Sequence, residues 1–476
     1  MKNAILVLLA LSLITACKRK GDELNNKAPL TYIAVTEMNL TGDDRLKSTV
    51  DLSWWGSDED GYVSAFEISL DGTSWTYTEQ YDSVFQFEID AGSDTVDIDF
   101  WVRAIDDDSL RDPDPAYLRI PIKNTPPTAT IDDVSFPEDS TRLIISFRWN
   151  ASDPDGDETI TGAYLKINEG DWEYIDTRKN LISIVPSTPE ATGPVTSQVY
   201  YNNEETIGVA DIEGLVLNDT NKVYLKVVDL AGTESEVDTS NVVFVKNKTS
   251  DLLLVGGLDL LTTAEYSSFI NQVYGSFDLE DYGREGSKYQ PKFWTPTFTA
   301  LLSMYDKLVF FSDASIFTNP VSGQKELLLE MASPSIQTFS NLGGKSLITT
   351  AFANDQNISS ITSTLPIDSL SSASGQAYVL PDSSIYSGSA LYPDLQPTLI
   401  ILGTDPFYHS VDATPIYRAQ LAVQAPWVGP DVVGAYRSNN GNINQYFFSV
   451  QLHEFNSEPQ ELYDLFDQIL NNDFNW

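Results

Sequence analysis

An internal duplication in the middle of the chain constrains its fold more than any other feature of the sequence. Residues 54–61 read WWGSDEDG and residues 149–156 read WNASDPDG, so a tryptophan, a serine, two aspartates and a glycine recur 95 positions later. Two further pairs of stretches match: FEISLDGTSW with YLKINEGDW (66–75 and 164–172), and FWVRAID with VYLKVVD (100–106 and 223–229). In each copy apolar and polar residues alternate over short stretches that Asp, Gly and Pro turns separate. This pattern predicts two antiparallel β-sandwiches.

The two copies resemble fibronectin type III and immunoglobulin-like domains, because they repeat at about 100 residues and each has a tryptophan in a predicted buried strand. The resemblance implies one sandwich over residues 28–123 and a second over residues 124–248. The disulfide of antibody domains is absent, since Cys17 is the only cysteine, and this favours the fibronectin-like version. Trp75 and Trp172 hold equivalent positions in the two copies, and we expect both to pack within the sandwiches.

The Ser-Asp-x-Asp-Gly motif of each copy has two interpretations. In the first it is a tight loop between two strands, in which aspartates accept hydrogen bonds from backbone N–H groups and glycine adopts a positive φ angle. In the second the loop also binds Ca²⁺, because closely spaced carboxylates supply the hard oxygen ligands that this ion prefers. The turn alone is favoured, and calcium stays open as a cofactor. The calcium interpretation uses Asp58, Asp60 and Asp106 in the first copy and Asp153, Asp155 and Asp157 in the second.

The N-terminus has the pattern of a secretory signal. Lys2 gives it a positive start, and the apolar stretch from Ile5 to Ile14 is too short to span a bilayer as a stable helix. The following Thr15-Ala16-Cys17 completes a resemblance to the lipobox of bacterial lipoproteins. The resemblance implies that residues 1–16 are a signal peptide and that fatty acids such as palmitate are attached at Cys17. Residues 17–27 are then a lipidated, polar tether to the membrane.

The residue after the cysteine and the net charge bear on location and partners. Lys18 stands where lipoproteins retained in the inner membrane of enteric bacteria have aspartate, so we expect a lipid-anchored protein of the outer membrane. Whether it faces the periplasm or the cell surface stays open. Without residues 1–16, which contain one basic residue, the chain has 69 acidic and 27 basic residues, a net charge of −42. This charge disfavours nucleic acid, and the expected partner is an envelope protein or a glycan.

Beyond residue 248 continuous apolar stretches alternate with helical patterns, which predicts βαβ units and a parallel sheet. The predicted strands are Leu252–Val255, Leu308–Phe311, Leu347–Thr350 and Leu399–Leu402, and the predicted helices are Ala264–Val273, Pro296–Tyr305 and Lys325–Leu342. A last helix is expected to begin at a Ser457 cap, with Gln460 completing a capping box. The expected fold class is therefore multidomain, with two all-β sandwiches followed by an α/β domain over residues 249–476.

The C-terminal part, residues 251–476, resembles the class I glutamine-amidotransferase-like fold, a flavodoxin-like, three-layer arrangement around a parallel sheet. NLGGKSLITTAFA (341–353) resembles the helix, turn and strand that lead into the nucleophile elbow of that family. QYFFSVQLHEF (445–455) resembles the late strand that ends near its catalytic His-x-Glu. The family's nucleophilic cysteine is absent, because threonines and an alanine occupy residues 349–351. A threonine hydroxyl without a tuned base is a poor replacement for it.

The resemblance therefore implies a pseudoenzyme, in which Thr350, His453 and Glu454 are degenerate active-site positions. The histidine and the glutamate are adjacent, and on a late strand they would point to opposite faces. No catalytic residue is assigned. No transition-metal site is predicted either, since the chain has only two histidines and no cysteine beyond the lipobox.

The predicted function is that of a non-catalytic envelope lipoprotein that serves as a binding or scaffold component. The alternative is a hydrolase whose site lies at the carboxyl ends of the parallel strands in the C-terminal domain. The two hypotheses differ in geometry. A hydrolase would place His453 and a carboxylate within hydrogen-bond reach of a hydroxyl in the crevice beyond Thr350.

Overall fold

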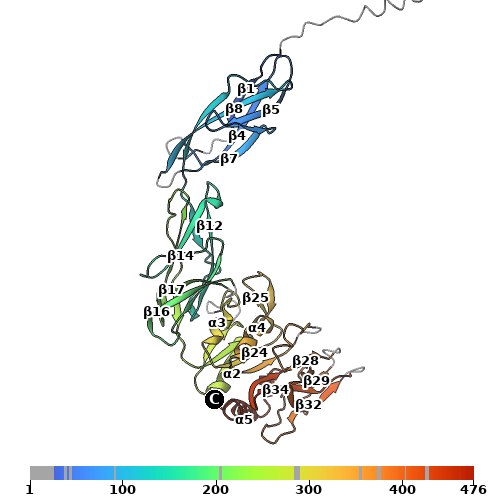
Figure 1. The fold of residues 1–476 in the computed structure, drawn as a ribbon. Coiled ribbons are helices and arrows are strands. Elements are labelled where there is room, and N and C mark those ends of the chain that lie inside the picture. The colour runs from blue at the N-terminus through green and yellow to red at the C-terminus, as the bar shows by residue number, and fades with distance from the viewer. Residues whose placement is uncertain are drawn as a thin grey trace, which may run out of the picture. The chain divides into compact units, whose positions relative to one another are not determined.

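The computed structural model describes most of the chain beyond residue 25 (Figure 1). The described ranges are 26–36, 40–41, 45–89, 93–202, 206–283, 290–352, 356–371, 377–402, 404–423 and 428–476. The chain divides into two compact units: unit 1 comprises residues 1–127, 153–159 and 229–233, and unit 2 comprises residues 128–152, 160–228 and 234–476. Cys17 and the predicted signal peptide lie outside the described ranges. Within these ranges no helix is both long and apolar enough to cross a membrane.

Unit 1 contains two sheets that pack face to face. A three-stranded antiparallel sheet has the order β1 (Leu30–Val35), β4 (Thr49–Ser57), β7 (Asp82–Gln86). A six-stranded sheet has the order β2 (Leu40–Thr41), β3 (Arg45–Leu46), β9 (Ala116–Lys123), β8 (Thr95–Asp106), β5 (Val63–Ser69), β6 (Thr76–Thr78). Trp54 of β4 contacts Phe66 of β5 and Phe100 of β8, with ring centroids 6.5 and 6.4 Å apart. The alternating pattern thus buries one face of each sheet, and the predicted sandwich is confirmed.

The β-rich part of unit 2 contains three sheets. The largest has the order β10 (Thr128–Ile131), β12 (Ile145–Ser152), β15 (Leu181–Pro186), β16 (Gly193–Tyr201), β17 (Thr206–Leu217). The others are β14 (Glu173–Ile175), β13 (Ile160–Ile167), β19 (Val223–Asp229), β20 (Asp238–Thr239), and β11 (Ser140–Arg142), β21 (Val243–Lys246), β18 (Asp219–Asn221). Trp149 of β12, Leu165 of β13 and Leu225 of β19 are buried in one cluster. This part is therefore also a β-sandwich, as the duplication predicts.

The two repeated tryptophans play the same structural part in their own sandwiches. Trp54 and Trp149 are each 1% exposed. The indole Nε1–H of Trp54 donates to the carbonyl of Gln80 at 2.8 Å, and that of Trp149 donates to the carbonyl of Lys179 at 2.8 Å. The duplication therefore preserves both a buried ring and the hydrogen bond that a buried indole requires.

We expect Trp149→Phe to lower the free energy of unfolding by about 1–3 kcal/mol, because the partly buried carbonyl of Lys179 loses its donor. A cavity left by the smaller ring adds to the loss. Urea denaturation followed by circular dichroism measures the change. Trp172→Phe is the matched control, since this ring is half-buried at the surface, and its expected cost is below about 1 kcal/mol. Equal losses in the two variants would contradict the assigned role of Trp149.

The other repeated pair, Trp75 and Trp172, does not pack inside the sandwiches as expected. Both rings are half-buried and lie beneath cations. The guanidinium carbon of Arg103 is 4.0 Å from the centre of the Trp75 ring, and Nζ of Lys226 is 5.0 Å from that of Trp172. The prediction was wrong because each tryptophan follows a turn and joins the outer face of its sheet, where a cation stabilises the ring.

The C-terminal part of unit 2 is built on an eight-stranded sheet, and in Figure 1 its last strands are orange to red. Five strands are parallel, in the order β23 (Asp278–Asp281), β22 (Leu252–Gly256), β24 (Lys307–Ser312), β27 (Lys345–Thr350), β35 (Asn442–Phe448). Antiparallel strands β34 (Val432–Asn439), β32 (Ala413–Ala419) and β30 (Ile385–Ser387) extend it. The predicted parallel sheet is present, and β27 is central in it.

Helices cover both faces of this sheet, because its buried strands are apolar on both sides. On one face α3 (Phe298–Ser303) and α4 (Leu328–Asn341) share an apolar cluster with Val255 and Phe310. On the other face α2 (Leu260–Val273) and α5 (Pro459–Asp467) share a cluster with Leu254 and Phe311. A π-helical turn, Gln468–Asp473, follows α5.

Short elements complete the structure. These are β25 (Ile316–Thr318) paired with β26 (Lys325–Leu327), β28 (Ile367–Leu370) with β31 (Phe407–His409), β29 (Ala377–Val379) with β33 (Leu421–Val423), and the 3-10 turns η2 (Asp157–Thr159) and η3 (Leu452–Glu454). The helix predicted from Lys325 therefore begins only at Leu328, because the first three residues pair as β26.

Two further local predictions were wrong. Residues 399–402 form no strand: Leu399 and Leu402 are 77% and 74% exposed, and only Ile401 makes an isolated bridge, to Val379. The sheet is extended beyond β35 by β34 instead. Ser457 does not cap the last helix, which has Glu458 at the cap position and proline as its first residue. The capping box does not form, because Ser457 lies one residue before the cap position and its hydroxyl makes no hydrogen bond to the described residues.

Candidate functional site

The carboxyl ends of the parallel strands open into a crevice of about 710 Å³. Strand β22 ends at Gly256 and β24 at Ser312, and the residues that follow them, Gly257 and Asp313, line the crevice. A Cβ atom at Gly257 would lie 2.6 Å from Cδ1 of Leu328, so the backbone approaches α4 as closely as only glycine allows. Crevices at this edge of an open parallel sheet are where ligands bind in α/β proteins.

The start of α2 gives the crevice its charge. Asp259 caps this helix by accepting hydrogen bonds from the backbone N–H groups of Leu261 and Thr262, at 2.8 and 3.0 Å. These bonds hold the pKa of Asp259 below its usual range. Because a carboxylate of the chain itself already occupies the positive end of the helix, the crevice is a poor site for phosphate or another anion.

His453 and Glu454 both line the crevice, which corrects the prediction that they point to opposite faces. They lie in the 3-10 turn η3 and not on a strand. Burial lowers the pKa of His453 to about 4, although the carboxylate of Asp259 opposes this shift. The imidazole is therefore neutral at neutral pH, and its ring packs edge-on against Tyr266 at 5.5 Å. Desolvation raises the pKa of Glu454.

Thr350 lies at the carboxyl end of β27, as expected, but it does not line the crevice. Its side chain is 1% exposed, and its hydroxyl is hydrogen-bonded to that of Ser312 at 3.1 Å. The neighbouring Thr349 donates to the carbonyl of Val450 at 2.6 Å. Among the side-chain contacts of the described residues, no hydroxyl is hydrogen-bonded to the imidazole of His453. The structure thus brings His453 and Glu454 together and leaves Thr350 in the sheet.

Sequence reasoning missed the two carboxylates that give the crevice its acidic character. Asp259 and Asp313 join Glu454 there, and Lys325 is the one lysine or arginine among the described residues that line it. Asp313 is held in place by accepting a hydrogen bond from the backbone N–H of Ser315 at 2.7 Å. Their positions in the sequence could have indicated them, because both aspartates follow soon after apolar strands, β22 and β24, that are neighbours in the sheet.

In the first Asp loop the carboxylates accept hydrogen bonds, as the turn interpretation predicts. Asp60 accepts from the backbone N–H of Lys27 at 3.2 Å. Asp106 accepts from the backbone N–H groups of Asp108 and Leu110 at 2.9 and 2.8 Å, and its other oxygen accepts from Asn26 at 2.6 Å. Asp58 makes only a long contact, 3.5 Å, with the N–H of Asp60, and desolvation raises its pKa.

The second Asp loop is more tightly hydrogen-bonded. Asp153 accepts from the N–H of Asp155 at 2.8 Å and from the hydroxyl of Thr159 at 2.7 Å, while Asp157 accepts from the N–H of Asp153 at 2.9 Å. Asp155 is 1% exposed and accepts from the backbone of Ser48 at 2.9 Å. In the part of the chain that is described, no group of three His, Cys, Asp or Glu side chains is arranged to hold a metal ion. Calcium binding stays a prediction.

No family model and no curated protein matches the sequence. Solved structures match at low similarity. The fibronectin(III)-like modules of Clostridium thermocellum CbhA are 15% identical, with 45% of this chain and 94% of that chain covered and a TM-score of 0.17. The FN1–FN3 domains of chicken CNTN1 are 13% identical, with 49% and 70% covered and a TM-score of 0.20. Such TM-scores carry no argument about this chain, whose sandwiches rest on their own sheets and cores.

Proposed function

We propose that this chain is a non-catalytic lipoprotein of the outer membrane that binds an envelope partner, a protein or a glycan, through its C-terminal domain. Lipid on Cys17 anchors it, and two fibronectin- or immunoglobulin-like sandwiches, residues 28–123 and 124–248, carry the binding domain. The single observation that carries the proposal is the crevice. It lies where α/β proteins bind ligands, yet its histidine has no hydroxyl or thiol partner among the described contacts.

We propose further that residues 249–476 are a degenerate amidotransferase-like domain. Support comes from the order of the five parallel strands, β23-β22-β24-β27-β35. The first strand of the domain, β22, has the second strand, β23, on one side and the three later parallel strands on the other. This is the strand order of flavodoxin-like sheets. Helices on both faces also fit that fold.

The charge of the crevice favours a basic group of a protein partner. Among the described residues, three carboxylates and one lysine line it, and the helix end that would attract an anion is already capped. A lysine or arginine side chain of the partner would replace the repulsion among these carboxylates by attraction.

Binding of a lysine-rich pentapeptide to the full chain in detergent, measured by calorimetry, tests this part of the proposal. The double variant Asp313→Asn, Glu454→Gln is expected to weaken binding by about tenfold, because it removes two of the attracting charges. The control is Glu236→Gln, Asp382→Asn, which changes the net charge equally at two exposed positions that do not line the crevice. Equal weakening in both variants would mean that only the overall negative charge attracts the peptide, and would contradict a crevice site.

The hydrolase alternative rests on the neutral imidazole of His453, which lies in the crevice with Glu454. Without a thiolate, transfer of the amide nitrogen of glutamine has no covalent route, so the purified protein is expected to release no ammonia from glutamine. Release that is lost on Thr350→Ala would overturn the non-catalytic proposal.

A further inference from the structure

A second cavity, of about 390 Å³, lies beside the edge strand β23, between this strand and the sandwich strands β11 and β21 of unit 2. Gln290 is the one described residue that it shares with the crevice at the strand ends. The volume of this second cavity falls within the range of about 300–1,000 Å³ that is usual for small-molecule sites.

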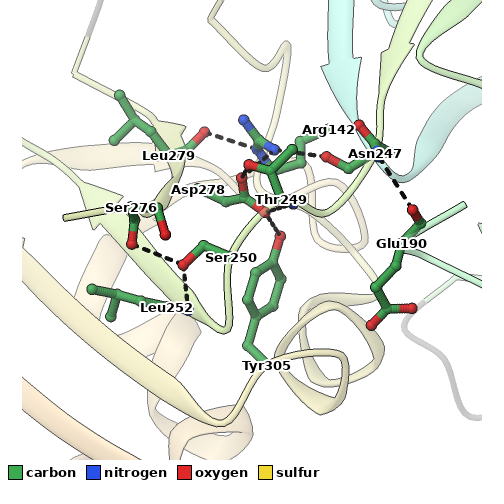
Figure 2. Close-up of polar contacts among 10 residues, drawn as sticks. All are labelled: Arg142, Glu190, Asn247, Thr249, Ser250, Leu252, Ser276, Asp278, Leu279 and Tyr305. Carbon is green, nitrogen blue, oxygen red and sulfur yellow. Dashed lines mark hydrogen bonds and ion pairs between the residues drawn. The ribbon is translucent and has the colours of Figure 1, made fainter. Parts of the chain in front are cut away.

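One wall is fixed by a buried ion pair (Figure 2). Nη1 of Arg142 lies 2.8 Å from a carboxylate oxygen of Asp278, and these side chains are 13% and 1% exposed. Asp278 also accepts from the hydroxyl of Thr249 at 2.6 Å and from that of Tyr305 at 3.0 Å, while Arg142 donates to the carbonyl of Asn247 at 3.0 Å. The wall is thus preorganised, since each charged group is held by several partners.

Glu280 is the buried carboxyl that faces this cavity. It lies two residues after Asp278 on β23, so the two side chains share a face of the strand. It is 8% exposed, and no hydrogen bond or ion pair from the described residues reaches its carboxyl group. Burial raises its pKa to about 7, against the opposing effect of Arg142 and Lys246. A buried acceptor without a donor is costly, and a ligand that donates to it would remove that cost.

The charges around Glu280 select the chemical class of that ligand. Because Arg142 is paired with Asp278, Lys246 is the base that opposes an ammonium group, while ionised Glu280 and Asp281 on the same strand oppose an anion. Lys292 and Glu138, at the rim, neutralise each other in an ion pair of 2.8 Å. A neutral hydroxyl group both donates and accepts, so it suits a wall whose described residues include three acids and three bases. Serine and threonine hydroxyls and the ring of Phe293 complete the lining.

We propose that this cavity binds a neutral saccharide unit, whose hydroxyl groups donate to the Glu280 carboxyl and accept from Arg142 or Lys246. This site is distinct from the crevice, and it does not depend on the basic partner proposed there.

The test uses the full chain in detergent and a panel of neutral sugars: glucose, galactose, N-acetylglucosamine and their β-linked disaccharides. Saturation-transfer NMR and calorimetry are expected to show binding of at least one of them with Kd below about 10 mM. Glu280→Leu, which removes the acceptor at similar volume, is expected to weaken that binding by about tenfold or more while the melting temperature stays equal or rises. The crevice variant Asp313→Asn, Glu454→Gln is expected to bind the sugar as the wild type does.

Three results would overturn the saccharide site. They are no binding of any panel sugar, unchanged binding by Glu280→Leu, or tighter binding of cadaverine or glutarate, the charged probes, than of every sugar. Loss of sugar binding in the crevice variant would also count against it, since the ligand would then sit in the crevice. Failure of the pentapeptide experiment leaves this result unaffected, so the two proposals fail separately.

Discussion

Replacing Arg142 by methionine is expected to lower the free energy of unfolding of unit 2 by about 3–5 kcal/mol, because it leaves the Asp278 carboxylate buried without its counter-charge. Asp278 is 0% exposed, and its remaining partners, Thr249 and Tyr305, are neutral donors that only partly replace a guanidinium. The arginine also holds the carbonyls of Asn247 and Leu279, which would lose their donors (Figure 2). The effect is large because the penalty is that of an uncompensated buried charge.

Guanidinium chloride denaturation of the full chain, followed by circular dichroism, measures this change. The matched control is Arg178→Met, which breaks the ion pair of Arg178 with Asp176 at 3.0 Å; that arginine is 84% exposed, so a loss below about 1 kcal/mol is expected. The double variant Arg142→Met, Asp278→Leu should recover much of the stability, since it removes the stranded charge together with the pair. Equal losses for the two arginine variants would contradict the assigned role of the buried pair.

Predictions from the sequence were correct where the local pattern of apolar residues indicates which strand faces are buried. The tryptophans at 54 and 149 were found because alternating apolar residues and a repeated turn motif suffice to place a strand in a sandwich. Strand β27 was predicted as a strand of the parallel sheet because it belongs to the continuous apolar stretches that alternate with helical patterns, and such stretches are typical of strands covered on both faces.

The same reasoning failed where tertiary contacts override local preference. The stretch around His453 reads as extended, yet the chain turns as η3 directly after β35, and this turn brings the histidine and Glu454 to one crevice. Residues 399–402 are as apolar as a buried strand, but three of the four stay exposed, and β34 occupies the position next to β35 in the sheet. Arg142 and Glu280 belong to elements far apart in the chain, so no local pattern joins them.

The largest expected effect of any single substitution is that of Cys17→Ser, which should abolish both incorporation of labelled palmitate and membrane association. The lipobox resemblance assigns the anchor to this thiol, and a serine hydroxyl cannot replace it, because the thiolate is the nucleophile that accepts the lipid. No other cysteine is present in the chain to take its place. The change is expected to be all-or-none, since each buried methylene of an acyl chain contributes about 0.8 kcal/mol to membrane binding.

Metabolic labelling with palmitate and fractionation of cells that express the wild type, Cys17→Ser or Lys18→Ser test whether Cys17 carries the lipid anchor. Lys18→Ser removes the neighbouring charge and keeps the lipobox, so it is expected to be labelled as the wild type is. Equal labelling of the wild type and Cys17→Ser, or a wild-type protein found only in the soluble fraction, would contradict the anchor. A soluble Cys17→Ser protein should keep the near-ultraviolet circular dichroism of the wild type, because the substitution changes none of the described residues of the two sandwich cores.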